Sequence, residues 1–317
     1  MSSYRDVNYS IRPGKSTERK LLVSLIRELC EGHSADYNYI GFGSTYFTDF
    51  KLFHKELHIP KLITIEKDRH IKERVEFNRP FNCIEIIMDE STNALKKISN
   101  WDQKYITWLD YDDTLTSYMF NDIDVVFKRL VASSIFLITC NSILRDENNK
   151  QFTKNSFRQK FGTMTPIELT NKDFASTNSP STIRELFISK INDVLNIKNR
   201  ALSDNDKLLF RPIFFFTYAD GAPMVTIGGF LDKKNNQVDF QNHSIAKFEA
   251  FLSFNDDPYK INPPNITYKE YQLLNKYVPS APNLYLKRKP IKFIPEREKK
   301  QFLELYKYLP NYMDVVS

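Results

Sequence analysis

Short apolar segments with the residues typical of β-strands alternate with helix-like segments between residues 37 and 139. In the intervening segments, apolar residues recur three or four positions apart, which is the spacing of an amphipathic helix. Strict alternation of this kind predicts an α/β fold whose parallel sheet is covered by helices on both faces. The predicted strands are residues 37–40, 61–65, 82–87, 104–109 and 134–139.

The alternation is interrupted after residue 141. Residues 142–208 are polar and irregular before a helix that we expect to begin at Ser181 or Thr182, and we interpret them as a helical insertion. Strand patterns return in residues 211–218 and 223–230, and the turn residues between them predict a hairpin. The parallel strands should therefore be followed by an antiparallel hairpin.

These patterns divide the chain into three parts. Residues 1–35 are predicted to be an N-terminal arm and a helix that begins at Ser16 or Thr17, and residues 36–257 the main domain. Residues 258–317 are predicted to form a small appendage, in which two helices flank a basic, strand-like stretch over 284–294.

Positive charge is concentrated in the appendage. The formal net charge of the chain is +6, and residues 258–317 contain 11 Lys and Arg against 5 Asp and Glu. The first 257 residues hold 34 of each sign and are balanced. A basic tail can bind nucleic acid or an acidic partner, although a Lys-rich, solvated surface is the simpler interpretation.

Other features exclude several classes of protein. No apolar run approaches the roughly 20 residues needed to cross a bilayer, so we expect no membrane span. The first 15 residues lack the apolar region of a secretory signal. Cys30, Cys83 and Cys140 are widely spaced and fit neither a disulfide framework nor a zinc ribbon. We therefore expect a cytoplasmic protein.

Glycine is scarce, with 8 residues in all, so the pair Gly41 and Gly43 at the end of the first predicted strand is notable. Gly-x-Gly after a strand, here followed by Ser44, allows a tight turn and the close approach of a ligand. The dinucleotide fingerprint needs a third glycine at position 46, where Tyr46 stands, and this disfavours a nicotinamide or flavin enzyme. Glu66 ends the next strand and could accept hydrogen bonds from both hydroxyls of a ribose.

Acidic residues also follow the third and fourth predicted strands. Asp89 could meet an adenine ring or, equally well, favour the start of a helix through the helix dipole. Asp110, Asp112 and Asp113 form an acidic loop after the fourth strand, unless this is merely a solvated turn. Asp110 should lie deepest, and Asp110 or Asp112 could act as a general base. Asn141 ends the fifth strand and could face Asp110.

Four successive strands followed by such residues, and then a hairpin, resemble the class I S-adenosyl-L-methionine-dependent methyltransferases. That superfamily has a Rossmann-like, seven-stranded sheet with five parallel strands, a sixth strand and an antiparallel seventh joined to it as a hairpin. The resemblance covers about residues 36–231, with 142–208 excepted. Residues 40–50 (IGFGSTYFTDF) are in addition similar to a group of bacterial proteins loosely labelled as O-methyltransferases.

The resemblance implies a role for each position at the sheet edge. In the superfamily, the glycine loop passes the methionine part of the cofactor, the acid after the second strand binds ribose, the residues after the third strand contact adenine, and those after the fourth face the methyl group. The positions matched to the cofactor are Gly41, Gly43, Ser44, Glu66, Asp89 and Asp110. We therefore expect an enzyme that methylates an oxygen of an unidentified acceptor.

Departures from the family pattern bear on a metal and on rival functions. Catechol-type members bind magnesium with an acid after the fourth strand and an Asp-Asn pair after the fifth. Asp110 and Asn141 match, but Cys140 replaces the Asp, which disfavours Mg²⁺, and we predict no metal ligands.

Two other functions stay open. The fold could serve as a non-catalytic or partner-activated nucleotide-binding subunit of a larger assembly, including one in defence, or as a homo-oligomer. The basic tail could instead make the protein an RNA or DNA methyltransferase. A basic entry to the first helix could clamp a phosphate or carboxylate, although such residues are more often solvated: Arg12, Lys15, Arg19 and Lys20.

Overall fold

Eight strands form a single mixed sheet within the part of the chain that the computed structural model describes, which is residues 12–310 except 147, 236, 249 and 251–256. Their order is β3-β2-β1-β4-β5-β7-β6-β8. The strands are β1 (Tyr37–Phe42), β2 (Lys61–Glu66), β3 (Ile84–Met88), β4 (Lys104–Thr114), β5 (Ile135–Asn141), β6 (Leu208–Asp220), β7 (Ala222–Lys233) and β8 (Tyr259–Ile261).

The pairing of the strands confirms the predicted α/β fold. β1 to β5 are parallel, and β7 runs antiparallel to both β5 and β6. The predicted strand count of seven is wrong, because β8 adds to the free edge of β6 in parallel. Only three residues long, β8 is too short to produce a recognisable alternation of apolar and polar side chains.

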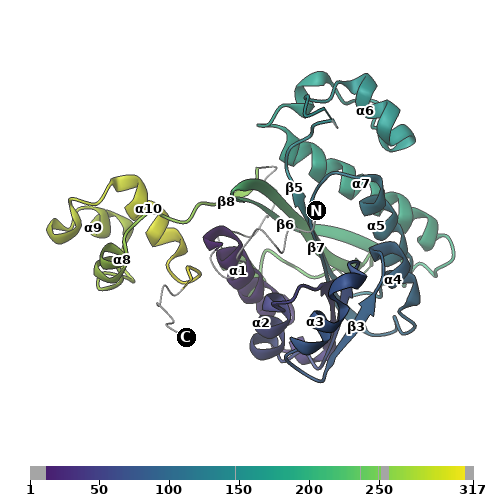
Figure 1. Ribbon diagram of the computed structural model, residues 1–317, viewed down its shortest axis with the longest axis horizontal. Helices are drawn as coiled ribbons and strands as arrows, with labels where there is room; N and C mark the ends of the chain where they lie inside the picture. Colours follow the sequence, from purple (N-terminus) through teal and green to yellow (C-terminus); the bar gives the residue numbers. More distant parts are fainter. Residues whose placement is uncertain (1–11, 147, 236, 249, 251–256, 311–317) are drawn as a thin grey trace.

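Helices cover both faces of the sheet, as the alternation predicted (Figure 1). α1 (Pro13–Leu29), α2 (Thr48–Leu57) and α3 (Lys72–Phe77) share one core with Tyr39 and Trp108. α4 (Ser91–Lys97), α5 (Ser117–Arg129) and α7 (Ser179–Asn199) share the other with Ile40 and Leu109. Neighbouring residues of one strand thus enter opposite cores, because side chains alternate across a sheet.

The predicted insertion contains α6 (Lys154–Phe161) and α7. α7 begins at Ser179, slightly earlier than the predicted Ser181 or Thr182, and it packs against α5 and β6. It is therefore part of the helical layer over the sheet. The aromatic side chains of Phe157 and Phe161 on α6 join the same core.

The first helix begins earlier than predicted, at Pro13 rather than at Ser16 or Thr17. Proline suits this position because its missing N–H has no partner in the first turn of a helix. The Asp220 carboxylate, in the β6–β7 hairpin, accepts hydrogen bonds from the N–H groups of Gly14 (2.8 Å) and Lys15 (2.7 Å). It thereby caps α1. Of the predicted arm, residues 1–11 lie outside the described residues.

The described part of the appendage contains three α-helices, which project from the sheet beyond β8 (Figure 1). They are α8 (Tyr268–Asn275), α9 (Pro282–Leu286) and α10 (Glu296–Leu305). The predicted strand-like stretch over 284–294 is wrong: α9 ends there and a single 3₁₀ turn, Lys289–Ile291, follows. Its buried residues are Tyr285, Ile291 and Ile294, a spacing that does not alternate as a half-buried strand requires. None of the described helices combines the length and the apolar character needed to span a bilayer.

Candidate functional site

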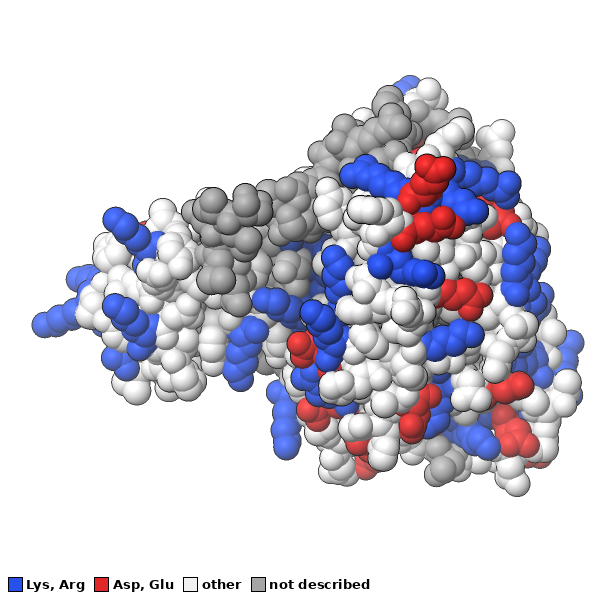
Figure 2. Space-filling view, turned by 60° about the horizontal axis from the view of Figure 1, so that its bottom comes forward, with Lys and Arg blue, Asp and Glu red and all other residues white. Residues whose placement is uncertain are grey.

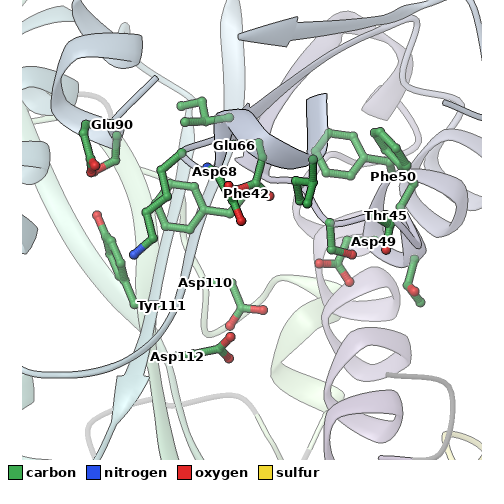
Figure 3. A pocket seen from close by; sticks show the side chains of 18 of the residues that line it. Phe42, Thr45, Asp49, Phe50, Glu66, Asp68, Glu90, Asp110, Tyr111 and Asp112 are labelled. Atoms are coloured by element: carbon green, nitrogen blue, oxygen red, sulfur yellow. The ribbon is translucent and has the colours of Figure 1, made fainter. Parts of the chain in front are cut away.

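A cavity of 680 Å³ opens at the carboxyl ends of β1 to β4. This is the edge where ligands bind in open α/β sheets. Phe42, Phe50 and Tyr111 form apolar parts of its wall, and carboxylates converge on it (Figure 3). Of the residues predicted for the site, it brings together Gly43, Ser44, Glu66, Asp89, Asp110 and Asp112.

The two glycines of the predicted loop differ in position. A Cβ on Gly43 would lie 2.0 Å from Thr64 Oγ1, so only glycine lets this loop lie directly against β2. Gly41 lies inside β1 and is not among the residues that line the cavity, contrary to the expected contact with a cofactor. A Cβ there would lie 2.4 Å from the Tyr39 hydroxyl oxygen, so Gly41 leaves room for a buried ring.

The loop between Gly43 and α2 has a fixed shape. Phe47, at its end, has a φ of 50°, in the left-handed region that a bulky residue rarely adopts. Its ring is buried and packs edge-on against Phe50, with centroids 5.6 Å apart. Packing of this side chain thus holds an unfavourable backbone conformation, which sets the direction in which the loop approaches the cavity.

Thr45 brings an unsatisfied hydroxyl to the cavity wall. The residue is buried and lines the cavity, and its Oγ1 atom has no hydrogen-bond partner among the described residues. A buried hydroxyl without a partner is unfavourable, so this atom is a ready contact for a polar ligand.

Glu66 and Asp89 contribute carboxylates in different states. Glu66 accepts a hydrogen bond from the Asp68 N–H (2.9 Å), and burial raises its pKa. Asp89 forms an ion pair with Lys97 and accepts a hydrogen bond from it, and this hydrogen bond lowers the pKa of Asp89. Asp89 also accepts a hydrogen bond from the Glu90 N–H (2.9 Å). Glu66 is therefore the more available acceptor for a ligand, because both carboxylate oxygens of Asp89 already have protein partners.

The acids after Leu109 lie on a strand rather than on the predicted loop. β4 continues to Thr114, and its register with β5 shifts between Asp110 and Thr114. Asp110 and Asp112 are two positions apart, which puts both on one side of the strand. Their carboxylates lie close together below the cavity in Figure 3. Asp113 also lines the cavity and accepts a hydrogen bond from the Tyr118 hydroxyl (2.7 Å).

A buried lysine holds Asp110. Lys15 Nζ lies 2.7 Å from Asp110 Oδ1 and 2.8 Å from Glu18 Oε2, and it lies 4.3 Å from the centroid of the Trp108 ring. Lys15 and Glu18 are 1% and 0% exposed. Burial opposes the charge on Lys15, but the two carboxylates raise its pKa on balance. Burial raises the pKa of Glu18. Asp110 therefore has a fixed cationic partner on α1.

A chain of hydrogen bonds ends on the same cluster. Trp108 Nε1 donates to Thr139 Oγ1 (2.9 Å), which lies 2.7 Å from Thr226 Oγ1, and Thr226 donates to Glu18. Because an indole N–H can only donate and each hydroxyl has a single proton, the direction of this chain is determined. Every step donates towards Glu18. The carboxylate thus terminates a network that spans β4, β5 and β7.

A second buried pair extends the α1 contribution to the cavity. Arg19 Nε donates to Asp49 Oδ1 on α2, and both residues are buried and line the cavity. The solvated interpretation of Lys15 and Arg19 was therefore wrong. Glu18 and Asp49 were not predicted from the sequence. One signal was present: the apolar stripe of α1 at Leu22 and Ile26 continues towards the N-terminus through Lys15, Glu18 and Arg19.

Asn141 does not line the cavity and so does not face Asp110 there. Its side-chain oxygen accepts a hydrogen bond from the Ile143 N–H (2.9 Å), which fits a residue that turns the chain. Cys140 is buried, and burial raises the pKa of its thiol. The described residues include no group of three or more His, Cys, Asp and Glu that could hold a metal ion.

Comparison with known proteins gives a family for almost the whole chain. A family model described as "Putative O-methyltransferase" matches residues 7–317. No curated protein matches the sequence.

Similar solved structures resemble the chain only distantly. A probable spermidine synthase from Corynebacterium glutamicum is 8% identical, with a TM-score of 0.43, over 73% of this chain and 68% of that one. Trm1 from Pyrococcus horikoshii, in complex with S-adenosyl-L-methionine, is 12% identical, with a TM-score of 0.43, over 69% and 55%. Spermidine synthase from Thermotoga maritima is 14% identical, with a TM-score of 0.40, over 78% and 68%. Likeness at this level indicates nothing about the reaction or ligands of this chain.

Proposed function

Because the chain belongs to the family described as "Putative O-methyltransferase", we propose that it binds S-adenosyl-L-methionine in the cavity at the carboxyl ends of β1 to β4 and transfers the methyl group to an oxygen atom of an acceptor. One observation carries this proposal. Polar side chains from four different strands, or from the loops directly after them, converge on one cavity at the edge where open α/β sheets bind ligands.

The charge of the cavity suits this cofactor. Among the described residues, eight acids and two basic residues line it, and one of the two, Arg19, is already paired with Asp49. S-adenosylmethionine is a cation at its sulfur atom, and when bound it supplies a methyl group that an oxygen nucleophile can attack. A negative site favours such a cation over nicotinamide or flavin phosphates. The unsatisfied Thr45 hydroxyl supports the fit.

Residues at the ends of β1, β2 and β3 would hold the cofactor in this proposal. Glu66 accepts hydrogen bonds from the ribose hydroxyls, because it ends β2 and, unlike Asp89, has no ion-pair partner among the described residues. The loop at Gly43 and Ser44 passes close to the methionine part, and Thr45 donates its hydroxyl proton to it. Asp89 stays at the adenine end, where Lys97 fixes its carboxylate.

Asp110 and Asp112 divide the work at the reacting end. Asp110 is fixed by Lys15 and balances positive charge, so its main role is electrostatic and positional. Asp112 is exposed and is the better candidate for the general base that takes the proton from the acceptor hydroxyl as the new O–C bond forms. Fixed orientation of the reactants supplies most of the remaining rate enhancement in an in-line methyl transfer.

Calorimetric titration with S-adenosylmethionine and S-adenosylhomocysteine tests the cofactor site. We expect micromolar binding to the wild-type protein and a loss of about tenfold or more in Glu66→Ala. Glu85→Ala is the matched control, because Glu85 is an exposed glutamate on β3 that pairs with Lys61 (3.5 Å) outside the cavity. Thr45→Val should also weaken binding without lowering the melting temperature, since the hydroxyl has no described protein partner.

Absence of binding to either ligand, by a protein that melts cooperatively, would refute the proposal. Binding without methyl transfer to any hydroxyl compound or RNA would favour a nucleotide-binding subunit instead. If an acceptor is found, Asp112→Asn should lower turnover by roughly 10²-fold or more with little effect on cofactor affinity. An equal loss of affinity and turnover would assign Asp112 to binding rather than to proton transfer.

A further inference from the structure

The appendage carries a compact group of exposed cations. Lys287, Arg288, Lys289 and Lys292 lie within six residues at the end of α9 and in the following 3₁₀ turn, and all four are exposed. We refer to these four residues as the basic turn. Figure 2 shows Lys and Arg side chains over the lobe at the left, where almost no acidic side chain is visible.

The basic turn lacks neutralising partners. None of its four cations has a carboxylate within ion-pair distance among the described residues, whereas Lys300 on α10 pairs with Glu296 (2.8 Å). Other acids of the appendage are engaged elsewhere. Glu270 accepts from the Thr267 N–H (2.7 Å), and Glu298 accepts from the Asn265 N–H (2.6 Å). The four charges of the turn are therefore exposed to solvent without a described ion-pair partner.

Exposed apolar side chains lie next to these charges in the chain. Phe293, directly after Lys292, is 68% exposed, and Leu284, just before the basic turn, is 67% exposed. The Arg288 guanidinium lies 5.0 Å from the centroid of the Tyr277 ring, which restricts one of the four cations to a fixed region. An exposed aromatic ring beside several cations is the combination that binds single strands, in which phosphates meet cations and an unpaired base stacks on the ring.

We propose that the basic turn and Phe293 form a binding surface for single-stranded nucleic acid. A double helix fits less well, because its bases are stacked on one another and cannot reach Phe293. The proposal is independent of methyl transfer, since the basic turn lies on the appendage and none of its residues lines the cavity.

An anionic membrane is the main competing partner, and the fold of the appendage argues against it. Binding in the plane of a bilayer needs a helix with an extended apolar face. The apolar residues of α10, Phe302 and Leu305, are buried in the appendage, and α9 has only five residues. Two separate exposed side chains, Leu284 and Phe293, do not make such a face.

The test measures binding of the full-length protein to a fluorescent 20-nucleotide oligouridylate by anisotropy over a range of salt concentrations. We expect affinity to fall as salt rises, with a slope of roughly −3 in log–log form if all four cations meet phosphates. Lys287→Gln/Arg288→Gln/Lys289→Gln/Lys292→Gln should weaken binding by at least about tenfold and flatten the slope. Phe293→Ala should cost about fivefold or more with the slope unchanged.

A matched control separates this surface from net charge. Lys51→Gln/Lys55→Gln/Arg158→Gln/Lys172→Gln removes the same charge from other exposed positions and should keep the affinity of the wild-type protein. Equal losses in the two quadruple variants would overturn the proposal, as would absence of binding at 100 mM salt. Sedimentation with phosphatidylserine vesicles, lost in the basic-turn variant while oligouridylate binding is absent, would assign the surface to a membrane instead. A duplex that binds as tightly as the single strand, regardless of Phe293, would also refute it.

Discussion

The molecule uses charge in two opposite ways, at the cavity and on the appendage. At the cavity, the cations Lys15 and Arg19 are buried and each contacts a carboxylate. On the appendage, the basic turn of Lys287, Arg288, Lys289 and Lys292 is exposed and has no described carboxylate partner.

Buried, paired cations hold neighbouring side chains in position, whereas exposed, unpaired cations attract a charged partner. A buried ion pair is weakly screened by salt and holds its members in one geometry, but it is costly to break because the remaining charge stays buried. An exposed, unpaired cation contributes little to stability, and its effect on a partner falls steeply with salt. Substitutions at the cavity should therefore be felt in folding, and those on the basic turn only in binding.

Lys15→Met should have the largest effect, because it leaves Glu18 buried without its cation. We expect a loss of about 3–5 kcal/mol in the free energy of unfolding, measured by urea denaturation. Since burial raises the pKa of Glu18, the loss should be smaller at low pH, where the carboxyl is protonated in both the folded and the unfolded state, and larger at pH 8. The double variant Lys15→Met/Glu18→Gln should recover much of the loss. A single-variant cost below about 1 kcal/mol would contradict the assignment of this cluster as a positioning device.

Asp220→Ala should lower the free energy of unfolding by less, about 0.5–2 kcal/mol. It removes the cap of α1 but leaves both carboxylate partners of Lys15 Nζ in place. Thermal denaturation checks this. Asp220→Asn keeps an oxygen that can accept one of the two backbone N–H groups, and it should retain part of the stability. If both variants melt at the wild-type temperature, the hairpin does not hold the start of α1.

Glu66→Gln should separate stability from ligand affinity. Burial raises the pKa of Glu66, so the folded state is less stable when this group is ionised. The stabilising contribution of protonated Glu66 is complete below its ordinary pKa of 4.5, and it is lost as the pH rises through the raised pKa of the folded state. The variant should thus melt slightly higher than wild type at pH 7 and equally at pH 4, while cofactor affinity falls. Glu85→Gln should change neither, and a lower melting temperature for Glu66→Gln at pH 7 would contradict the sign.

The smallest effect on stability is expected at the basic turn. Lys289→Gln/Lys292→Gln should change the free energy of unfolding by no more than about 0.5 kcal/mol, as for most exposed substitutions. Salt up to 0.5 M should leave the difference between variant and wild type unchanged, because no described ion pair is removed. A loss comparable to that of Asp220→Ala would mean that these lysines support the fold of the appendage.

The sequence predicted the sheet well, because most of its strands are long enough to show a period. It did not predict β8 or the helical turn after α9. Tyr259–Ile261 is too short to alternate, and the apolar residues near Ile291 face an appendage core that no local pattern reveals. β4 was predicted too short, since polar residues from Asp110 onward look like a loop although they continue the strand.

The site was predicted where it depends on strand ends and missed where it depends on tertiary contacts. Glu66 and Asp110 follow buried strands, so their arrival at one edge follows from parallel pairing alone. The pairing of Lys15 with Asp110 joins residues 95 positions apart and depends on how α1 crosses the sheet. No local sequence pattern determines how α1 crosses the sheet. The charged residues on the apolar stripe of α1 do predict that these side chains are buried and have partners of opposite charge.

The cap that Asp220 places on α1 has a consequence for biosynthesis. Asp220 lies 206 positions after Gly14 and 205 positions after Lys15 in the chain. The helix that carries Lys15 therefore leaves the ribosome long before the hairpin that caps its first turn. Until β6 and β7 are made, Glu18 also lacks the hydroxyl of Thr226. The nascent chain therefore contains β1 to β5 before it contains the hairpin, and a polypeptide released before residue 220 would lack the residues that cap α1 and that donate to Glu18.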